Sequence, residues 1–140
     1  MNMRSRQGKN RRAFATSQDG GTTWSAVAYD ARLPEPSCQG SLVRFTDRRH
    51  HDKDRVLLAT PASPARRAEM TVRVSYDECE SWPSAKVIHK GSAAYSDLAV
   101  SHDLNVHLFY EADNYVQIRL ARFNLQWLTD GKDHVGKMTE

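Results

Sequence analysis

Two aspartates of the chain lie in the same short pattern. Ser17 to Trp24 reads SQDGGTTW and Ser75 to Trp82 reads SYDECESW, so each aspartate follows a serine by two residues and precedes a tryptophan by five. A carboxylate at this spacing can take part in proton transfer, but in a turn it accepts hydrogen bonds from the backbone amides of its own loop. We therefore expect Asp19 and Asp77 to be structural, each closing a hairpin between two strands.

The two copies differ two residues after the aspartate, where Gly21 stands in the first copy and Cys79 in the second. Gly21 takes positive φ without cost, and we expect Trp24 to bury its ring while its indole N–H finds a partner. Cys79 occupies the equivalent position in the second copy, where positive φ would cost on the order of 1 kcal/mol. The residues expected to form the two turns are Ser17, Asp19, Gly21 and Trp24 in the first copy and Ser75, Asp77 and Trp82 in the second.

Other side chains that could bind or react with a ligand are weaker evidence of a functional site when each is taken alone. Arginine binds planar anions with two parallel hydrogen bonds, yet most arginines are simply surface residues. Tyr95, by itself, is typical of a half-buried packing residue. His50 and His51 are adjacent, and neighbouring side chains of an extended segment point to opposite faces, so we expect no metal and no cofactor. The charged segment 47–55 (DRRHHDKDR) indicates a solvated hairpin tip.

Composition limits the classes of partner. The 140 residues carry 20 Lys and Arg against 17 acids, a net charge of +3 that is too small and too dispersed to indicate nucleic-acid binding. No apolar run reaches the roughly 18 residues of a membrane helix, and the start, MNMRSRQGKNRR, lacks the apolar centre of a signal peptide. We expect no membrane partner, and the localisation stays open. Cys38 and Cys79 are expected as reduced thiols, with a single bridge left open.

The hydrophobic pattern predicts a single all-β domain over residues 1–140. Short alternating runs predict strands, and segment 70–76 (MTVRVSY) alternates as a strand with one buried and one wet face. Several short strands separated by turn residues are typical of a sandwich, barrel or propeller, and the repeated turn favours the propeller. The predicted strands are 12–17, 42–46, 55–60, 70–76, 97–101, 105–111 and 116–123, followed by a helical turn at 124–128.

Longer motifs identify a family resemblance. The two repeated turns resemble the Asp-boxes (BNR repeats) of the exo-α-sialidase (neuraminidase) family, whose catalytic domain is a six-bladed β-propeller. Further similar segments follow in order along nearly the whole chain: MNMRS, PSCQGS, ARRAEMTVRVSYDE, GSAAYSDL, LFYEA and IRLARFNLQWLTDGKD. The resemblance implies a partial propeller of about three antiparallel blades, the C-terminal half of the catalytic domain, with the N-terminal blades absent.

The resemblance also implies a chemistry. Sialidases release terminal sialic acid from glycoconjugates by a retaining mechanism with a tyrosine nucleophile. A phenol suits this substrate because the anomeric carbon bears a carboxylate, which would repel a second carboxylate. Arg4 and Arg67 match two of the three arginines that bind the substrate carboxylate, and Tyr95 matches the nucleophile. Arg66 is expected to face away on an extended strand, and Asp97 receives no catalytic role. The implied partner is a sialylated glycan or a related nonulosonic acid.

Three parts of the family's catalytic set have no counterpart in the sequence: the acid/base aspartate, the glutamate that activates the tyrosine, and the first arginine. Glu111 belongs to a different family segment and does not replace that glutamate. We therefore expect this chain alone to be inactive. A partial propeller would also expose the sheet flanks on which further blades pack, so we expect either a head-to-tail homodimer that completes the ring or a piece of a longer protein. The alternatives are a non-catalytic carbohydrate-binding or scaffolding β protein, and a nucleic-acid module supported only by the basic charge balance.

Overall fold

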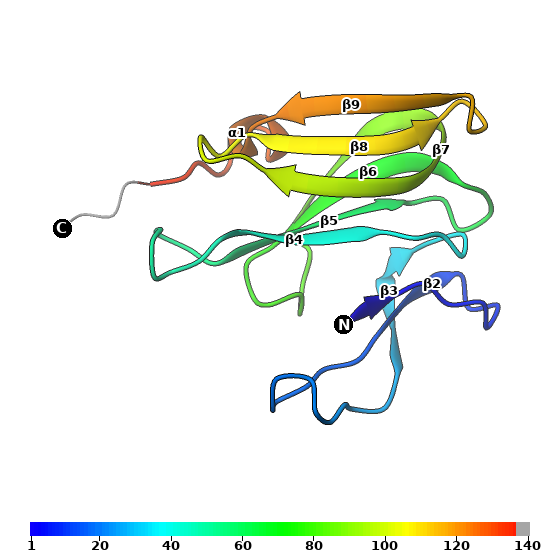
Figure 1. Ribbon diagram of the computed structural model, residues 1–140, viewed down its shortest axis with the longest axis horizontal. Coiled ribbons are helices and arrows are strands. Elements are labelled where there is room, and N and C mark those ends of the chain that lie inside the picture. The colour runs from blue at the N-terminus through cyan, green and yellow to red at the C-terminus, as the bar shows by residue number, and fades with distance from the viewer. Residues whose placement is uncertain (137–140) are drawn as a thin grey trace.

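The computed structural model describes residues 1–136 and is built almost wholly from antiparallel strands (Figure 1). One sheet has the order β1-β2-β3, and the other has the order β4-β5-β6-β7-β8-β9. The all-β prediction is thereby confirmed. The elements are β1 (Asn2–Met3), β2 (Arg11–Phe14), β3 (Ala28–Pro34), β4 (Ser41–Thr46), β5 (Arg55–Pro61), β6 (Ala68–Ser75), β7 (Ser84–Val100), β8 (Val106–Ala112), β9 (Gln117–Phe123) and α1 (Leu125–Leu128).

Strand β7 divides the larger sheet into two units. Its first part pairs with β6 up to Ser92, and its second part pairs with β8 from Ala93 onward, with register shifts in both ladders. Such irregularities bend a strand and increase its twist. The sheet therefore curls, with β4 to β9 stacked in chain order and β2 and β3 beside β4 (Figure 1). Together with β1–β3 this gives three antiparallel units, the number predicted.

All the strands predicted from alternation are present, and Asn124 caps the predicted helical turn by accepting a 2.8 Å hydrogen bond from the Trp127 backbone N–H. The pattern did not predict β1, β3 or the first part of β7. Strand β3 contains aspartate and proline, and the first part of β7 contains two lysines and Gly91, so both segments resemble loops by composition. Pairing with β2 and β6 makes them strands.

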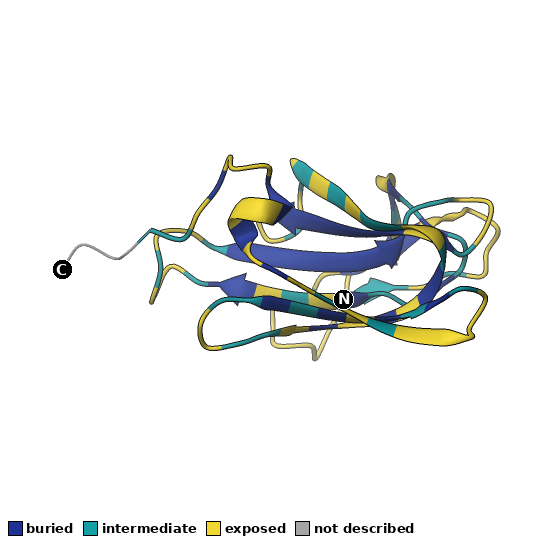
Figure 2. Ribbon diagram, turned by 90° about the horizontal axis from the view of Figure 1, so that it is seen from above, coloured by how far each residue is buried: buried dark blue, intermediate teal, exposed yellow. Residues whose placement is uncertain are grey.

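Burial departs from the prediction in β6. The core-facing residues Met70, Val72 and Val74 are fully buried, as expected, but Thr71 and Arg73 on the supposedly wet face are also buried. Strand β6 lies between β5 and β7, and Asp30 of β3 is near enough for its charge to act on Arg73, so the smaller sheet lies close to this second face. The Arg73 guanidinium donates a 3.2 Å hydrogen bond to Thr60 Oγ1, and its burial lowers its pKa. Figure 2 shows that buried strand segments run through the middle of the molecule.

The first repeated turn joins β2 to β3 and is closed by its aspartate, as predicted. Asp19 Oδ1 accepts hydrogen bonds from the Thr23 backbone N–H at 2.9 Å and from Ser17 Oγ at 2.8 Å. Ser17 Oγ in turn accepts from the Gly21 backbone N–H at 2.8 Å, where Gly21 has φ of 96°. The hydrogen bonds from the Thr23 backbone and side chain, followed by that from Ser17, hold the pKa of Asp19 well below its usual range.

The tryptophan of the first turn departs from the prediction. The Trp24 indole N–H donates to Gly21 O at 3.0 Å, as expected, but 45% of the side chain is exposed. The ring therefore lies over its own turn and does not plug the core. Trp82, its equivalent, is only partly exposed and lines a hollow between the two sheets together with Leu33 and Leu42.

The second repeated turn joins β6 to β7 and repeats the hydrogen bonds that the serine and the aspartate make in the first turn. The Ser81 backbone N–H donates to Asp77 Oδ1 at 2.8 Å, and the Cys79 backbone N–H donates to Ser75 Oγ at 2.9 Å. Cys79 has φ of 76°, so the cysteine does lie in the left-handed region that its glycine equivalent favours. Glu78, the preceding residue, has φ of 55°.

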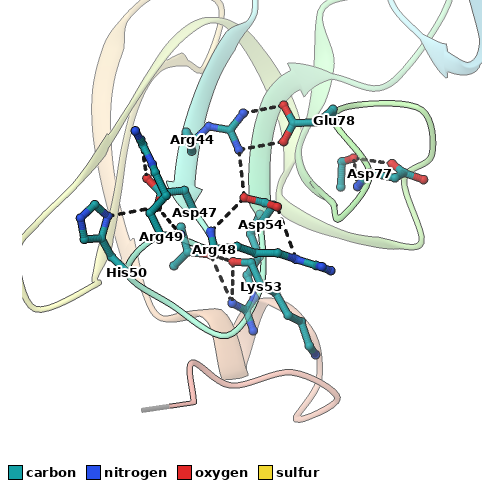
Figure 3. Close-up of polar contacts among 12 residues, drawn as sticks. Arg44, Asp47, Arg48, Arg49, His50, Lys53, Asp54, Asp77 and Glu78 are labelled. Atoms are coloured by element: carbon teal, nitrogen blue, oxygen red, sulfur yellow. Dashed lines mark hydrogen bonds and ion pairs between the residues drawn. The ribbon is translucent and has the colours of Figure 1, made fainter. Parts of the chain in front are cut away.

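Segment 47–55 forms the predicted charged hairpin tip between β4 and β5, except that Arg55, expected to be solvated, is the buried first residue of β5. An arginine of β4 connects the tip to the second turn (Figure 3). Arg44 donates to both carboxylate oxygens of Glu78, at 2.8 and 2.5 Å, and lies 3.7 Å from Asp54. Asp47 accepts from Arg49 and contacts His50 Nδ1 at 3.0 Å. His50 thereby makes a side-chain hydrogen bond within the tip.

No group of three or more potential metal ligands occurs among residues 1–136, and no helix in that range is long and apolar enough to cross a membrane. Cys38 and Cys79 are both free thiols, the first buried and the second partly exposed. Burial raises the pKa of each thiol.

Candidate functional site

Arg4, Arg67 and Tyr95, which the sequence singled out, lie together in the fold. Arg4 follows β1, Arg67 immediately precedes β6, and Tyr95 lies in β7. Arg4 Nη1 donates a 3.0 Å hydrogen bond to Tyr95 Oη, and the Arg67 guanidinium carbon lies 5.2 Å from the centre of the Tyr95 ring. Segments from both sheets therefore converge on one phenol.

Strand β7 presents Tyr95 outward. The side chain is 42% exposed, whereas Ala94 and Ser96 on either side are buried. The Tyr95 backbone N–H donates to Glu111 Oε2 at 3.1 Å, so the carboxylate of Glu111 binds the strand backbone. The hydroxyl of Tyr95 has Arg4 as its partner. This arrangement agrees with the expectation that Glu111 does not take the place of the missing base.

The PSCQGS segment holds β7 beside Tyr95. The Gln39 side-chain amide bonds both backbone groups of Ser96, because Nε2 donates to Ser96 O and Oε1 accepts from the Ser96 N–H, each at 2.9 Å. Ser41 Oγ donates to Asp97 Oδ1 at 3.0 Å and accepts from the Leu98 N–H at 2.9 Å. Asp97 thus has a structural contact, in keeping with the absence of a catalytic assignment.

A buried ionic network supports the segment that carries Arg4. Glu35 is fully buried and accepts from the Cys38 backbone N–H at 2.6 Å and from the Ser5 N–H at 3.4 Å. Arg12, also buried, donates to Cys38 O at 2.7 Å and to Asn2 Oδ1 at 2.6 Å, with its Nη1 3.9 Å from Glu35. The network joins the chain before and after Arg4 to the loop that precedes β4, which fixes the arginine relative to β7.

The two site arginines have no carboxylate partner among residues 1–136, although most ion pairs of the chain involve arginine. Arg67 donates to two neutral acceptors, Tyr115 Oη at 3.0 Å and Ser37 O at 3.3 Å. Burial by itself lowers the pKa of Arg67, but the Tyr115 hydrogen bond together with the electrostatic effects of Cys38, Tyr115 and Tyr95 leaves that pKa raised. Two positive charges therefore face the exposed phenol without being neutralised.

Around Arg67, the structure differs from the expectation for Arg66 and adds residues that the motifs did not identify. Arg66 lies in the bend before β6 and not on an extended strand; it is exposed and lines the same hollow as Arg67 and Tyr115. Tyr115 belongs to none of the family segments quoted above, so no sequence signal singled it out. Gln39 lies within PSCQGS, but its contact with β7 required the tertiary structure.

The geometry suits the binding of a planar anion. A guanidinium offers donors in a rigid plane that matches a carboxylate, and two such groups on either side of a phenol hold the anion close to the phenolic oxygen. The hydrogen bond from Arg4 also stabilises negative charge as it develops on Tyr95 Oη. The site therefore places two guanidiniums without carboxylate partners beside an exposed phenol oxygen.

Comparisons with known proteins identify the family of the chain. Residues 1–108 match the BNR repeat-like domain family. The chain is 38% identical over 120 residues to a sialidase of Micromonospora viridifaciens and 30% identical over 128 residues to an exo-alpha-sialidase of Aspergillus fumigatus. These alignments cover 84% and 79% of the chain but only 18% and 31% of the relatives, so the chain spans less than a third of either.

Solved structures show the same relationship in three dimensions. The Hadza microbial sialidase Hz136 matches with a TM-score of 0.79 and 28% identity, over 91% of this chain and 25% of that one. The intramolecular trans-sialidase from Ruminococcus gnavus matches with a TM-score of 0.75 and 20% identity, over 87% of this chain and 29% of that one, which supports the fold. The chain adopts part of a β-propeller and belongs to the BNR repeat-like domain family, within the exo-α-sialidases.

Proposed function

We propose that this chain supplies the carboxylate-binding and nucleophile part of an exo-α-sialidase site. Arg4 and Arg67 bind the carboxylate on the anomeric carbon of a terminal sialic acid, and Tyr95 Oη is the nucleophile. The observation that carries the proposal is the convergence of two guanidiniums without carboxylate partners on one exposed phenol. The names of the relatives, a sialidase and an exo-alpha-sialidase, support the same substrate class.

The proposed reaction is a retaining one. Tyr95 Oη attacks the anomeric carbon and loses its proton while the bond to the aglycone oxygen breaks and that oxygen takes up one proton, so the step involves no net gain or loss of protons. Water then displaces the tyrosine and restores the phenol. A phenol with an ordinary pKa of about 10 needs a base to become a good nucleophile, and the Tyr95 hydroxyl is bonded to a cation and not to a carboxylate. We therefore propose that this chain by itself binds sialosides without hydrolysing them.

Binding is tested with the methyl α-glycoside of N-acetylneuraminic acid, titrated into the ¹⁵N-labelled chain and followed by NMR. We expect saturable shifts near Tyr95. Arg67→Lys and Arg4→Lys should each weaken binding about tenfold or more, because lysine does not make the bidentate contact. Tyr95→Phe keeps both guanidiniums and should still bind. The carboxamide analogue of the glycoside, which lacks the negative charge, is the matched ligand control.

Equal binding of the carboxylate and the carboxamide, or equal binding by the lysine variants, would contradict the carboxylate-clamp assignment. Hydrolysis is measured separately with a fluorogenic sialoside. If the purified chain hydrolyses this sialoside and Tyr95→Phe abolishes the hydrolysis, the proposal that the chain is inactive alone is overturned. The same result would support Tyr95 as the nucleophile. Binding without turnover, retained in Tyr95→Phe, is the expected result.

A further inference from the structure

Tyr115 is the second phenol of the site, and no motif assigns it a role. It lies in the turn between β8 and β9, and its hydroxyl oxygen accepts the 3.0 Å hydrogen bond from Arg67 Nη1. The side chain is 57% exposed, so packing alone does not explain its orientation. Each guanidinium of the site is therefore hydrogen-bonded to one phenol, Arg4 to Tyr95 and Arg67 to Tyr115.

The backbone beneath Tyr115 is fixed although the ring is exposed. Asp113, Asn114 and Tyr115 have φ values of 51°, 56° and 70°, three successive left-handed residues without a glycine. Such a conformation is unfavourable for residues with a Cβ atom and persists where neighbouring contacts determine it. Here the Asp113 and Asn114 backbone N–H groups donate to Ser92 O and Ser92 Oγ, each at 3.1 Å. Arg119 Nη2 also donates to Asp113 Oδ2 at 2.5 Å.

We propose that Tyr115 is a positioning residue that holds the Arg67 guanidinium in the orientation that receives the substrate carboxylate. The inference rests on the proposed function of this site. Arginine has large rotational freedom, and Arg67 is restrained at three points: Tyr115 Oη at Nη1, Ser37 O at Nη2, and the Tyr95 ring 5.2 Å away. Removing the Tyr115 hydroxyl removes the restraint on Nη1 of the planar Arg67 guanidinium.

A neutral partner is suited to this task in a way that an acidic one is not. A carboxylate at the position of the Tyr115 hydroxyl would neutralise Arg67 and compete with the substrate for it, whereas a phenol leaves the positive charge intact. A guanidinium has five N–H donors, and two of those of Arg67 are used by Tyr115 and Ser37. Three donors remain, enough for a bidentate contact with a carboxylate.

The first test is spectroscopic and needs no ligand. Side-chain ¹⁵N–¹H signals of the arginines are recorded for the folded chain, and that of Arg67 is assigned by its loss in Arg67→Lys. We expect slow rotation of the Arg67 guanidinium, seen as separate Nη signals, and averaged signals in Tyr115→Phe. Tyr110→Phe is the matched control, because Tyr110 is buried in the core and its ring lies near His89. The control should leave the Arg67 signals unchanged.

The second test is binding of the methyl α-glycoside of N-acetylneuraminic acid, with the folding of each variant checked by circular dichroism and thermal unfolding. Tyr115→Phe should raise Kd about fivefold, as expected for one lost restraining hydrogen bond, and Tyr110→Phe should not change it. Unchanged Arg67 signals and unchanged Kd in Tyr115→Phe would overturn the inference while leaving the proposed function intact. A wild-type chain that shows no saturable binding would instead overturn the proposed function, and with it the role given to Tyr115.

Discussion

At the scale of single residues, the distinguishing feature of the site is that its two arginines have no carboxylate partner among residues 1–136. Arg12 and Arg55 are buried beside carboxylates, whereas Arg4 and Arg67 donate to a phenol or a carbonyl and keep their charge available. Arg4 is exposed and Arg67 is only partly buried, so both charges remain accessible to an anionic ligand. Tyr95 and Tyr115 complete this arrangement, because phenols accept hydrogen bonds without neutralising the cation.

Cys79 is the residue at which local strain leads to a measurable prediction. Its φ of 76° suits glycine, which occupies the equivalent position in the first turn. Cys79→Gly should therefore stabilise the chain by about 0.5–1 kcal/mol, the relief of strain being partly offset by the greater freedom of glycine in the unfolded chain. Denaturant unfolding measures the change. Cys79→Ala, which keeps the Cβ atom, is the control and should give no gain; an equal gain in both variants would assign the effect to the thiol.

At the scale of elements, an ion cluster joins β5 to the segment after α1. Arg55 is fully buried and donates to Asp133 Oδ2 at 2.7 Å and to Asp52 Oδ1 at 2.9 Å. Lys53 Nζ lies 3.3 Å from Asp133 Oδ1. Burial alone would raise the pKa of Asp133, but the hydrogen bonds from Arg55, then those from Tyr76 and Lys53, lower it to about 2. The cluster thereby secures the segment after α1 to the central strands.

The lowered pKa of Asp133 predicts how stability depends on pH. Because the folded pKa is about 2 and the ordinary value is 3.8, the ionised group stabilises the fold by about 2 kcal/mol above pH 4, and this is lost as the pH falls towards 2. Asp133→Asn should cost about 3 kcal/mol at pH 7, since it leaves Arg55 with Asp52 alone. Denaturant unfolding between pH 7 and 2 should show the two proteins converging. A gap that stays constant over this range would contradict the assignment.

At the scale of the whole molecule, the edge strand β9 exposes apolar side chains. In β9 and the residue before it, Val116, Ile118 and Leu120 are 80%, 77% and 53% exposed, while Arg119 and Phe123 on the other face are less exposed. Phe109, paired with Leu120 in β8, is 50% exposed. A continuous apolar face on an edge strand is a surface at which proteins associate. This agrees with the expectation that a partial propeller exposes the flanks on which further blades pack.

Association through β9 is therefore expected for the isolated chain. The double variant Ile118→Lys with Leu120→Lys should lower the mass measured by light scattering at a given concentration, because two charges on this face oppose its burial. Gln126→Lys adds a charge at an exposed position of α1 and is the control, with no effect expected. A wild-type chain that is a well-folded monomer would rule out the head-to-tail pair of half-propellers, which stays a prediction until then.

The sequence by itself determined the features that depend on neighbouring residues. Alternation fixed the predicted strands, and the two Ser-x-Asp turns close as expected, because their partners lie within a few residues along the chain. Motifs also identified Arg4, Arg67 and Tyr95, which the fold brings together. Only the tertiary structure decided which side chains are buried and which residues far apart in the sequence are in contact, because both depend on which elements pack together. It buried both faces of β6, left Trp24 exposed and placed the Tyr115 hydroxyl against Arg67, since no local pattern encodes which strands and turns meet in space.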